Sequence, residues 1–384
     1  MKKTRILFAA ILALLLILTV SCATAIKPLT FESWDIHTEA QRQWLDAEDY
    51  TKPHLYGAKG AVEMSLPVSP TFEWKYSGFS AKDVAYATLA IGEEPSLDGA
   101  DVYEIPAGQK SFTVADGAMN LKVNTTYYWQ ITAVLADGTS LSSPVEQFTT
   151  DGGIRNISVD GVTNFRDMGG YTTSDGGTVR QGLIYRSGRF NVKYRTKLEI
   201  TEKGLEQIRR LGIVTDIDLR GDKSENLTPV VYANGYPVDG SVEMVSPLGE
   251  DVNYVFIPRE WDSTLLNGEN GASMIREVFE VLSDEANYPV VFHCSIGTDR
   301  TGVTAFLIGC ALGLSDDDLM RDYFFSNFGN ISTSRLLSNF QAAIYVVSKY
   351  HEGGTYAEKG VDYLLKNGVT QEQIDALRSI MIEY

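Results

Sequence analysis

The chain has 384 residues, of which 44% are hydrophobic, and a formal net charge of −17 at pH 7. This length is sufficient for two domains with separate hydrophobic cores. A protein this acidic is not expected to bind nucleic acid non-specifically, because negative charge repels the phosphate backbone.

Residues 1–21 are expected to be a targeting segment. Basic residues precede the apolar run 6–20, which is too short to span a bilayer comfortably. The stretch 18–22, Leu-Thr-Val-Ser-Cys, resembles a bacterial lipobox, in which the chain is cleaved before the cysteine and Cys22 receives a lipid. An ordinary signal peptide followed by an incidental cysteine is the alternative. Ala23 follows Cys22, which by the same resemblance implies a cell-envelope lipoprotein with a lipid anchor in the outer membrane.

Residues 22–60 are predicted to be a tether followed by an edge element. The run 41–45, Gln-Arg-Gln-Trp-Leu, is compatible with a short helix, which the following Lys52-Pro53 would end. No side chain here suggests chemistry, and Trp34 and Trp44 are interpreted as packing anchors.

Residues 61–150 have the pattern of an all-β, immunoglobulin-like sandwich. Alternating segments at 71–76, 84–91 and 125–134 are separated by Asp-Gly turn signals. The run Asn-Thr-Thr-Tyr-Tyr-Trp from Asn124, together with the closing Phe-Thr-Thr, resembles a fibronectin type III domain. Because such a fold does not define a function, the domain is interpreted as a spacer or docking module, with glycan or protein binding as the alternative.

Residues 154–384 are predicted to form an α/β domain after the linker 151–153. Strands are expected near 183–186, 214–219 and 290–292. Helices are expected at 202–211, 273–282, 301–314, 315–326, 333–349, 360–367 and 371–382. The acids 316–318 follow Ser315 and are interpreted as the first turn of a capped helix rather than as a metal cluster.

The centre of this domain is the stretch 290–302, Val-Val-Phe-His-Cys-Ser-Ile-Gly-Thr-Asp-Arg-Thr-Gly. An apolar strand ends in His293 and Cys294, a short loop follows, and an apolar helix begins near Arg300. Loop amides and the positive end of the helix would form an anion nest, for which Gly297 supplies the conformational freedom. The planar guanidinium of Arg300 matches two phosphate oxygens.

Cys294 is the expected nucleophile. A field that binds a phosphate dianion also favours thiolate over thiol, so the pKa of Cys294 should fall. The expected phosphate-binding residues are Ser295, Ile296, Gly297, Thr298 and Thr301, the last of which could also donate a hydrogen bond to the sulfur when it leaves. A buried structural cysteine near a surface arginine is the alternative. Cys310 lies in the apolar helix and is interpreted as plain core, which leaves no pair for a structural disulfide.

This stretch resembles the active-site loop of the cysteine-dependent protein tyrosine phosphatases. Segments that resemble the bacterial branch of that family lie at 164–171, Asn-Phe-Arg-Asp-Met-Gly-Gly-Tyr, and then at 182–187, 216–220 and 318–327. The resemblance implies action on phosphotyrosine, phosphoserine or phosphoinositides. Relatives often carry lysine where this chain has Thr298, and that lysine is associated with multiply charged substrates such as phosphoinositides. Thr298 therefore weakens the prediction of a phosphoinositide substrate and leaves the prediction of phosphotyrosine unchanged.

A carboxylate must protonate the leaving oxygen and then activate water. Asp299 is the first candidate, since it lies in the loop beside Arg300 and relatives hold an aspartate there. Asp262 is the alternative, because it lies in a glycine-rich region long enough to be a lid. The remaining polar residues near the strand ends are interpreted as structural: a network of Asp216, Asp218, Arg220 and Glu225, and a scaffold of Arg166 and Asp167.

The sequence therefore predicts a protein-tyrosine phosphatase that forms a phosphocysteine intermediate. Its partners would be phosphorylated proteins or small phosphomonoesters, and the membrane through the lipid on Cys22. The histidines have no metal-ligand spacing, so neither a metal nor another cofactor is expected. Two alternatives remain: a phosphoinositide or small-phosphate phosphatase, and a non-catalytic envelope module that binds phosphorylated ligands through the same loop.

Overall fold

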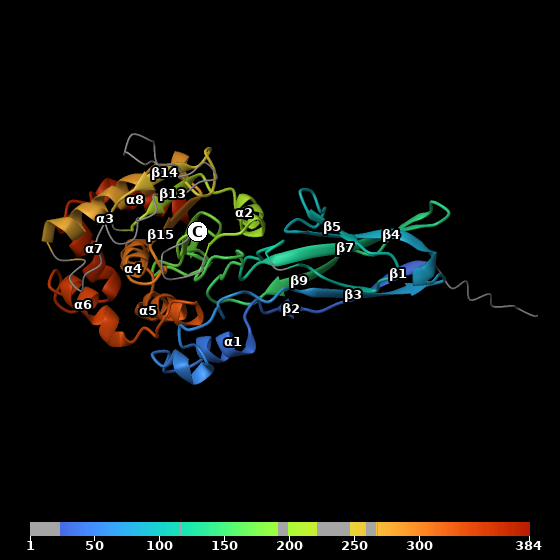
Figure 1. Ribbon diagram of the computed structural model, residues 1–384, viewed down its shortest axis with the longest axis horizontal. Coiled ribbons are helices and arrows are strands. Elements are labelled where there is room, and N and C mark those ends of the chain that lie inside the picture. The colour runs from blue at the N-terminus through green and yellow to red at the C-terminus, as the bar shows by residue number, and fades with distance from the viewer. Residues whose placement is uncertain (1–23, 116, 191–198, 221–245, 259–265, 267) are drawn as a thin grey trace, which may run out of the picture. The chain divides into compact units, whose positions relative to one another are not determined.

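The computed structural model describes residues 24–115, 117–190, 199–220, 246–258, 266 and 268–384 (Figure 1). The expected targeting segment 1–21 and Cys22 lie outside them. The chain divides into two compact units that alternate along the sequence. The first contains the described part of Met1–Thr30, Phe72–Phe112 and Tyr128–Glu146, and the second contains Phe31–Thr71, Thr113–Tyr127 and Gln147–Tyr384. Within the described residues, no helix has both the length and the apolar character needed to cross a membrane.

The first unit is built mainly of antiparallel strands. In one sheet, β3 (Thr71–Ser77) lies between β1 (Ala25–Leu29) and β6 (Ser111–Thr113). In the other, β4 (Val84–Gly92) pairs with β5 (Asp101–Ile105) and β7 (Thr126–Leu135), and β7 pairs with β8 (Ser140–Ser142). Alternate residues of β3 and β7 are buried, and the rings of Phe72 and Trp129 lie 4.9 Å apart. This alternation is what the sequence pattern predicted, whereas the likeness to a fibronectin type III domain stays a prediction.

The second unit is organised around a five-stranded sheet in the order β10-β12-β15-β13-β14. The strands are β10 (Arg166–Asp167), β12 (Ile184–Ser187), β15 (Val290–His293), β13 (Thr215–Asp218) and β14 (Asn253–Phe256). All are parallel except β10, which is antiparallel to β12. Because the central strands are parallel, their carboxyl ends meet at one edge, where β15 ends beside Ser187 and Asp218.

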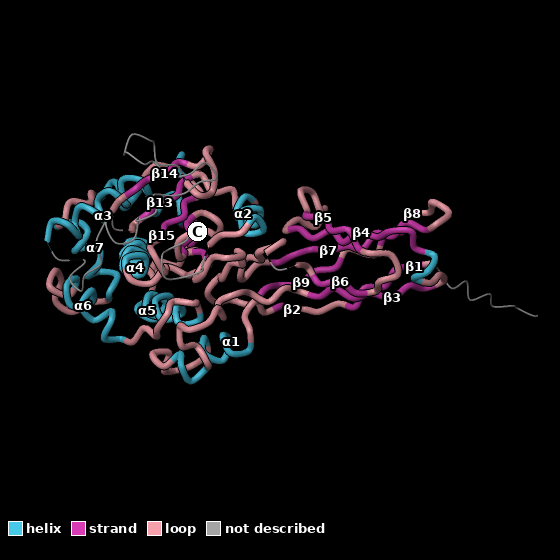
Figure 2. Tube along the Cα trace, viewed as in Figure 1, coloured by secondary structure: helices cyan, strands magenta, loops and turns pink. Residues whose placement is uncertain are grey.

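Helices and short strand pairs complete this unit (Figure 2). The helices are α1 (Glu39–Leu45), α2 (Glu202–Arg209), α3 (Gly268–Leu282), α4 (Arg300–Leu312), α5 (Asp316–Phe325), α6 (Leu337–Val347), α7 (Tyr356–Lys366) and α8 (Gln371–Met381). β2 (Ser33–Trp34) runs parallel to β9 (Glu146–Thr150), and β11 (Thr178–Val179) is antiparallel to β16 (Ile382–Glu383). Ser315 caps α5 by accepting a hydrogen bond from the amide of Asp318, and the acids 316–318 lie in the first turn of this capped helix, as predicted.

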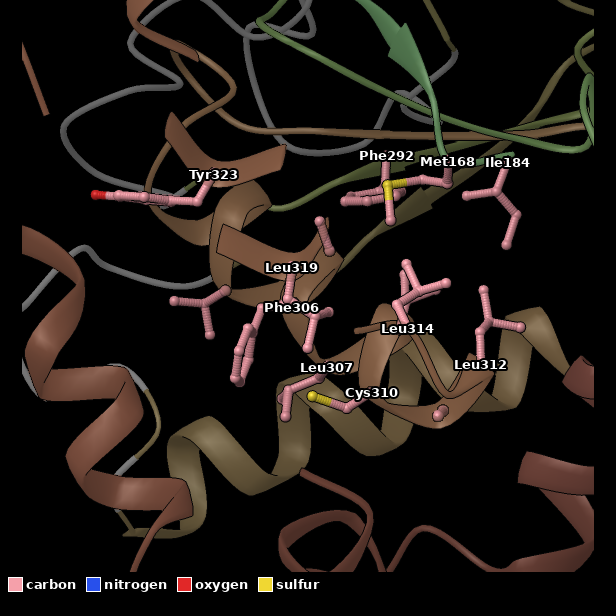
Figure 3. Packing of buried hydrophobic residues seen from close by; sticks show 14 of the residues in the cluster. Met168, Ile184, Phe292, Phe306, Leu307, Cys310, Leu312, Leu314, Leu319 and Tyr323 are labelled. Carbon is pink, nitrogen blue, oxygen red and sulfur yellow. The ribbon is translucent and has the colours of Figure 1, made fainter. Parts of the chain in front are cut away.

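The main hydrophobic core lies between this sheet and α4 (Figure 3). Ile184 and Phe292 of the sheet belong to the same buried cluster as Leu307 and Leu312 of α4. Cys310 is also buried there, and burial raises the pKa of its thiol well above the usual value. It is therefore an unreactive core residue, as the sequence indicated.

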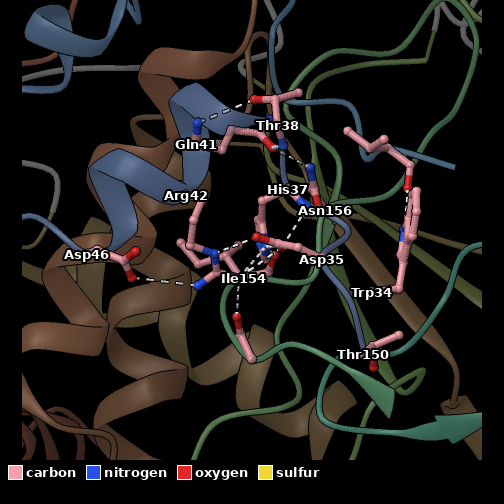
Figure 4. Close-up of polar contacts among 12 residues, drawn as sticks. Trp34, Asp35, His37, Thr38, Gln41, Arg42, Asp46, Thr150, Ile154 and Asn156 are labelled. Carbon is pink, nitrogen blue, oxygen red and sulfur yellow. Dashed lines mark hydrogen bonds and ion pairs between the residues drawn. The ribbon is translucent and has the colours of Figure 1, made fainter. Parts of the chain in front are cut away.

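Residues 31–71 belong to the second unit, although the sequence suggested a tether for much of this segment. Trp44 of α1 is fully buried, with its ring 5.5 Å from that of Phe328. Figure 4 shows the polar contacts nearby, where Arg42 forms an ion pair with Asp35. Arg42 also donates to the carbonyl oxygen of Gly152 at 2.8 Å, in the expected linker. The segment is thus an integral part of the fold of this unit.

Candidate functional site

The loop predicted as the centre of the domain connects β15 to α4. Cys294 follows the strand directly and is 1% exposed, and Arg300 begins the helix and is 3% exposed. Ser295, Thr298 and Thr301 are also buried, while Ile296 and Asp299 are partly exposed. The structure therefore brings all the predicted loop residues together between one strand end and one helix start.

Gly297 is required by the close approach of another strand end. Its φ is +71°, in the left-handed region that glycine adopts without steric cost. A Cβ at this position would lie 2.5 Å from the carbonyl group of Ser187. The loop can keep this path next to β12 only with glycine at position 297.

Side chains from outside the loop hold its carbonyl oxygens. The Asn164 amide donates to the oxygen of Gly297 at 2.8 Å and to that of Ile296 at 3.3 Å. Arg186 donates to the Gly297 oxygen at 2.9 Å, and Arg189 donates to the oxygen of Ser295. In a trans peptide the N–H points away from the C=O, so the following amides face the other side of the loop. That arrangement matches the predicted anion nest.

One of these supports, Arg186, depends on a buried carboxylate. Asp322 of α5 forms ion pairs with Arg166 and with Arg186, and all three side chains are at most 8% exposed. Burial and the neighbouring Arg166 lower the pKa of Arg186 to about 10, so it remains charged at neutral pH. Arg166 is thus a scaffold residue, as predicted. Asp167 is also structural, because it pairs with Arg155 and accepts the amides of Gly169 and Gly182.

The environment of Cys294 favours its thiolate. Burial by itself would raise the pKa of the thiol. The positive charge of Arg300 and then the polar groups of Thr301 outweigh burial, and the pKa of Cys294 falls below its usual value. Arg300 is held in turn by a hydrogen bond of 3.2 Å to the carbonyl oxygen of Leu219. The direction agrees with the sequence-based expectation for a nucleophilic cysteine.

His293, next to the nucleophile, is part of a buried polar network on the strand ends. Its Nε2 lies 3.1 Å from Asp216 and its Nδ1 lies 3.9 Å from Asp218. Although burial opposes a charge on the imidazole, the two carboxylates, first Asp218 and then Asp216, raise the pKa of His293. Arg220 and the hydroxyl of Tyr254 also bind Asp218. These residues form the structural network that the sequence suggested, while Glu225 lies outside the described residues.

The structure describes only one of the two candidate acids. Asp262 lies outside the described residues. Asp299 precedes α4, yet its side chain makes no capping hydrogen bond to that helix. Both carboxylate oxygens instead accept hydrogen bonds from Arg335, at 2.9 Å from Nε and 2.8 Å from Nη2. Arg335 also lies close enough to Cys294 for the two charges to interact.

Sequence reasoning missed several of these supports. Arg186 and Asp322 lie in segments that resemble the phosphatase family, but nothing in their spacing indicated that they would meet. Arg189 and Arg335 lie in no such motif, so no sequence signal identified them. Their contacts arise only from the tertiary path of the chain.

Comparison with known proteins identifies one family. Residues 157–383 match the tyrosine phosphatase family. A protein of Cupriavidus necator, whose name assigns it provisionally as a tyrosine-protein phosphatase, is 26% identical over 185 residues. The matched region is 46% of this chain and 65% of that relative, so the chain spans less than two thirds of the relative's length.

Among solved structures, the core catalytic domain of the PP-IP phosphatase SIW14 from S. cerevisiae, in complex with citrate, is 16% identical. That likeness covers 49% of this chain and 88% of the yeast chain, with a TM-score of 0.31. A second structure of the Siw14 catalytic core is 14% identical, covers 50% of this chain and 93% of that one, and has a TM-score of 0.27.

Proposed function

Because the chain belongs to the tyrosine phosphatase family, we propose that it is a cysteine-based phosphatase that hydrolyses phosphotyrosine monoesters. The observation that carries this proposal is the buried thiol of Cys294, whose pKa is lowered by Arg300 and Thr301, in a loop whose carbonyl oxygens are held by Asn164 and Arg186. A phosphate dianion and a thiolate are stabilised by the same donors, so the loop can bind the substrate and activate the nucleophile together.

In the first step, the sulfur of Cys294 attacks phosphorus and the bond to the leaving oxygen breaks. Asp299 gives that oxygen a proton, so a phenol departs and a phosphocysteine remains. In the second step, Asp299 takes a proton from water while the water oxygen attacks phosphorus. The S–P bond breaks, inorganic phosphate leaves and the thiolate is restored. Arg300 and the loop amides hold the equatorial oxygens in both steps.

The loop chemistry supports substrates with a single phosphate group over substrates that carry several. Thr298 is buried and uncharged at the position where relatives often carry a lysine. Arg335 is already engaged by Asp299 through both carboxylate oxygens. Phosphorylated proteins and small aryl phosphates are therefore the proposed substrates, with phosphoserine and phosphothreonine as further members of the same test panel.

Turnover of p-nitrophenyl phosphate by the purified protein tests this function. We expect vanadate-sensitive hydrolysis that is lost in Cys294→Ser, and faster turnover of phosphotyrosine peptides than of inositol phosphates. Phosphate binding without any turnover would instead indicate a non-catalytic binding module. Preference for inositol phosphates would overturn the substrate assignment but keep the thiolate chemistry.

We also propose that the protein is an envelope lipoprotein, with Cys22 as the lipidated residue and the β-strand unit as a spacer or docking module. The support is the pattern of residues 1–22: basic residues, an apolar run and a cysteine at the expected cleavage position. This localisation would place the phosphatase where its substrates are envelope or extracellular phosphoesters.

A further inference from the structure

We infer that Arg335 is the positioning residue for Asp299, and that residues 59–64, upstream of the 157–383 family match, hold Arg335 in place. This inference rests on the proposed function, because it assigns the support of the acid in that reaction. Arg335 itself touches no reacting atom in the proposed mechanism. It acts through the carboxylate that it binds.

The contact between the two residues has the geometry of a fixed clamp. A planar guanidinium that binds both oxygens of a carboxylate sets its orientation as well as its distance. The side chains of Arg335 and Asp299 are only 13% and 15% exposed, so solvent screens the pair less than a surface ion pair. Since Asp299 makes no side-chain capping bond to α4, Arg335 is the group that orients it among the described residues.

The clamp bears on both proton-transfer steps of the proposed mechanism. When Asp299 gives its proton to the leaving oxygen, it becomes a carboxylate, and a neighbouring cation stabilises that developing charge. In the second step, the carboxylate must face the attacking water. A bidentate partner holds the same orientation in both steps, which a flexible side chain would not do.

Arg335 is itself held by a buried side chain. The Oδ1 of Asn327 accepts the Arg335 amide at 2.7 Å, and its Nδ2 donates to the Arg335 carbonyl oxygen at 3.1 Å. Asn327 is 0% exposed and its Nδ2 also donates to the carbonyl oxygen of Phe324 at 2.9 Å. The backbone of Arg335 is thereby tied to the end of α5.

An upstream segment braces the same loop. The amide of Gly60 donates to the oxygen of Asn327 at 2.8 Å, and the Gly60 oxygen accepts the amide of Ile331 at 3.0 Å. Ser334 donates its hydroxyl to the oxygen of Lys59 at 2.9 Å. The carboxylate of Glu63 accepts the amide of Asn330 at 3.2 Å and the hydroxyl of Thr163. Residues 59–64 therefore line the loop 327–335 with backbone and side-chain contacts.

Gly60 offers a specific way to disturb this brace. Its φ is +69°, and an added Cβ would lie 2.8 Å from both the Thr333 oxygen and the Ile331 side chain. Gly212 provides a matched control, since its φ is +64° but nothing lies within 4 Å of its added Cβ. Alanine at either position is strained by the positive φ. Only at Gly60 would its Cβ also clash with the loop that carries Arg335.

The first experiment measures leaving-group dependence in the full chain with Arg335→Gln, Arg335→Lys and Asp299→Asn. p-Nitrophenolate is a good leaving group that departs without being protonated, whereas the leaving oxygens of phenol and tyrosine must be protonated. A misplaced acid should therefore slow the hydrolysis of phenyl and tyrosyl phosphates selectively. We expect Arg335→Gln to lower kcat/KM for phenyl phosphate at least about tenfold more than for p-nitrophenyl phosphate. Arg335→Lys keeps the positive charge but not the planar guanidinium that binds both oxygens. Its selective loss of kcat/KM for phenyl phosphate should be smaller than that of Arg335→Gln.

A double variant supplies the coupling test. Asp299→Asn with Arg335→Gln should show the same leaving-group dependence as Asp299→Asn alone, because Arg335 affects protonation of the leaving oxygen only through that carboxylate. Arg378→Gln is the control for loss of an ion pair: Arg378 binds Asp175 and the Ala311 carbonyl near the far end of the 13-residue α4, about 20 Å away. It should leave the leaving-group dependence unchanged.

The glycine variants test the brace formed by residues 59–64. Gly60→Ala should show a smaller selective loss of kcat/KM for phenyl phosphate than Arg335→Gln, and Gly212→Ala should show none.

The outcomes are distinguishable. Equal losses on both substrates in Arg335→Gln and Arg335→Lys, or additive losses in the double variant, would overturn the positioning role. Normal leaving-group dependence in a folded Gly60→Ala protein would overturn the brace. If the turnover of the parent protein is not lost in Cys294→Ser, the proposed function is overturned, and this inference with it.

Discussion

The side-chain amide of Asn164 donates a hydrogen bond of 2.8 Å to the carbonyl oxygen of Gly297, a residue 133 positions further along the chain. Asn164 has a φ of +59°, a conformation that asparagine tolerates better than most residues. The first segment that resembles the phosphatase family thus supports the loop that follows Cys294. The motif is explained by a contact rather than by chemistry of its own.

Asn164→Gly should therefore weaken the loop without changing the backbone conformation that position 164 needs. We expect a loss of about 1–3 kcal/mol in the free energy of unfolding, because the loop carbonyls lose a buried donor, and a parallel loss of p-nitrophenyl phosphate turnover. Urea denaturation and steady-state kinetics measure the two effects. Asn124→Gly is the control, since Asn124 has a φ of +50° but does not touch the loop. Unchanged turnover in Asn164→Gly would contradict the supporting role.

Thr301→Val should raise the pKa of Cys294, because the side chain of Thr301 is one of the groups that lower it. The thiolate will then appear at higher pH, and the acidic limb of the kcat/KM profile will shift in the same direction. The difference in ultraviolet absorbance between each protein and its Cys294→Ser partner reports the thiolate. Cys310 does not interfere, since burial keeps its pKa well above the usual value. An unshifted limb would show that the side chain of Thr301 does not help to lower the pKa of Cys294.

Asp322→Asn should destabilise the protein strongly. It leaves Arg166 and Arg186 buried without their shared carboxylate, for which a loss of about 3–5 kcal/mol is expected. Burial opposes the charge on Asp322, but Arg166 and Arg186 outweigh it and lower its pKa. The stabilisation is thus present above the usual aspartate pKa and lost as the pH falls through the lower folded value. Denaturation in acid should show a steeper decline for the parent than for the variant. Asp175→Asn, which breaks a more exposed pair with Arg378, should destabilise the protein much less.

His293 should give the opposite pH dependence. Its folded pKa is raised by Asp218 and Asp216 in spite of burial, so its contribution is complete below the usual histidine pKa. That contribution is lost as the pH rises through the raised folded value. Unfolding free energies measured from mildly acidic to alkaline pH should therefore decline in the parent and stay flatter in His293→Gln. Parallel curves for the two proteins would rule out a charged His293 in the folded state.

Cys22→Ser tests the proposed lipid anchor. We expect the parent to sediment with membranes and the variant to appear in the soluble fraction, with phosphatase activity per molecule unchanged because the catalytic loop is distant in sequence. Mass spectrometry of the N-terminal peptide should find acyl chains on the parent alone. A membrane-bound Cys22→Ser protein would point to a different mode of attachment.

Local patterns in the sequence were sufficient to predict most of the central strands of the second unit. The apolar runs that predicted strands at 183–186, 214–219 and 290–292 correspond to β12, β13 and β15, with bounds shifted by a residue or so. Strand β14 was not predicted, because Asn253–Phe256 is short and its residues are only partly buried. A four-residue segment at the sheet edge has too little apolar periodicity to identify it.

The residues of the site were also predicted only where their arrangement is local in the sequence. Cys294, Gly297 and Arg300 were predicted because they are neighbours in the sequence and their chemistry is local. Arg335 was not predicted, because its value lies in a contact with Asp299 that depends on how α5 ends and how residues 59–64 pack. The integration of residues 31–71 into the catalytic unit was missed for the same reason.

The alternation of the two units along the chain has a consequence for biosynthesis. Trp44 and Arg321 are in contact although 277 residues separate them, so α1 leaves the ribosome long before its packing surface on α5 exists. Until then, the indole of Trp44 is an exposed apolar group on an unfinished polypeptide. A protein with this order of assembly is a natural client for a holding chaperone, and a ribosome stalled before α5 would display a nascent chain that is prone to aggregate.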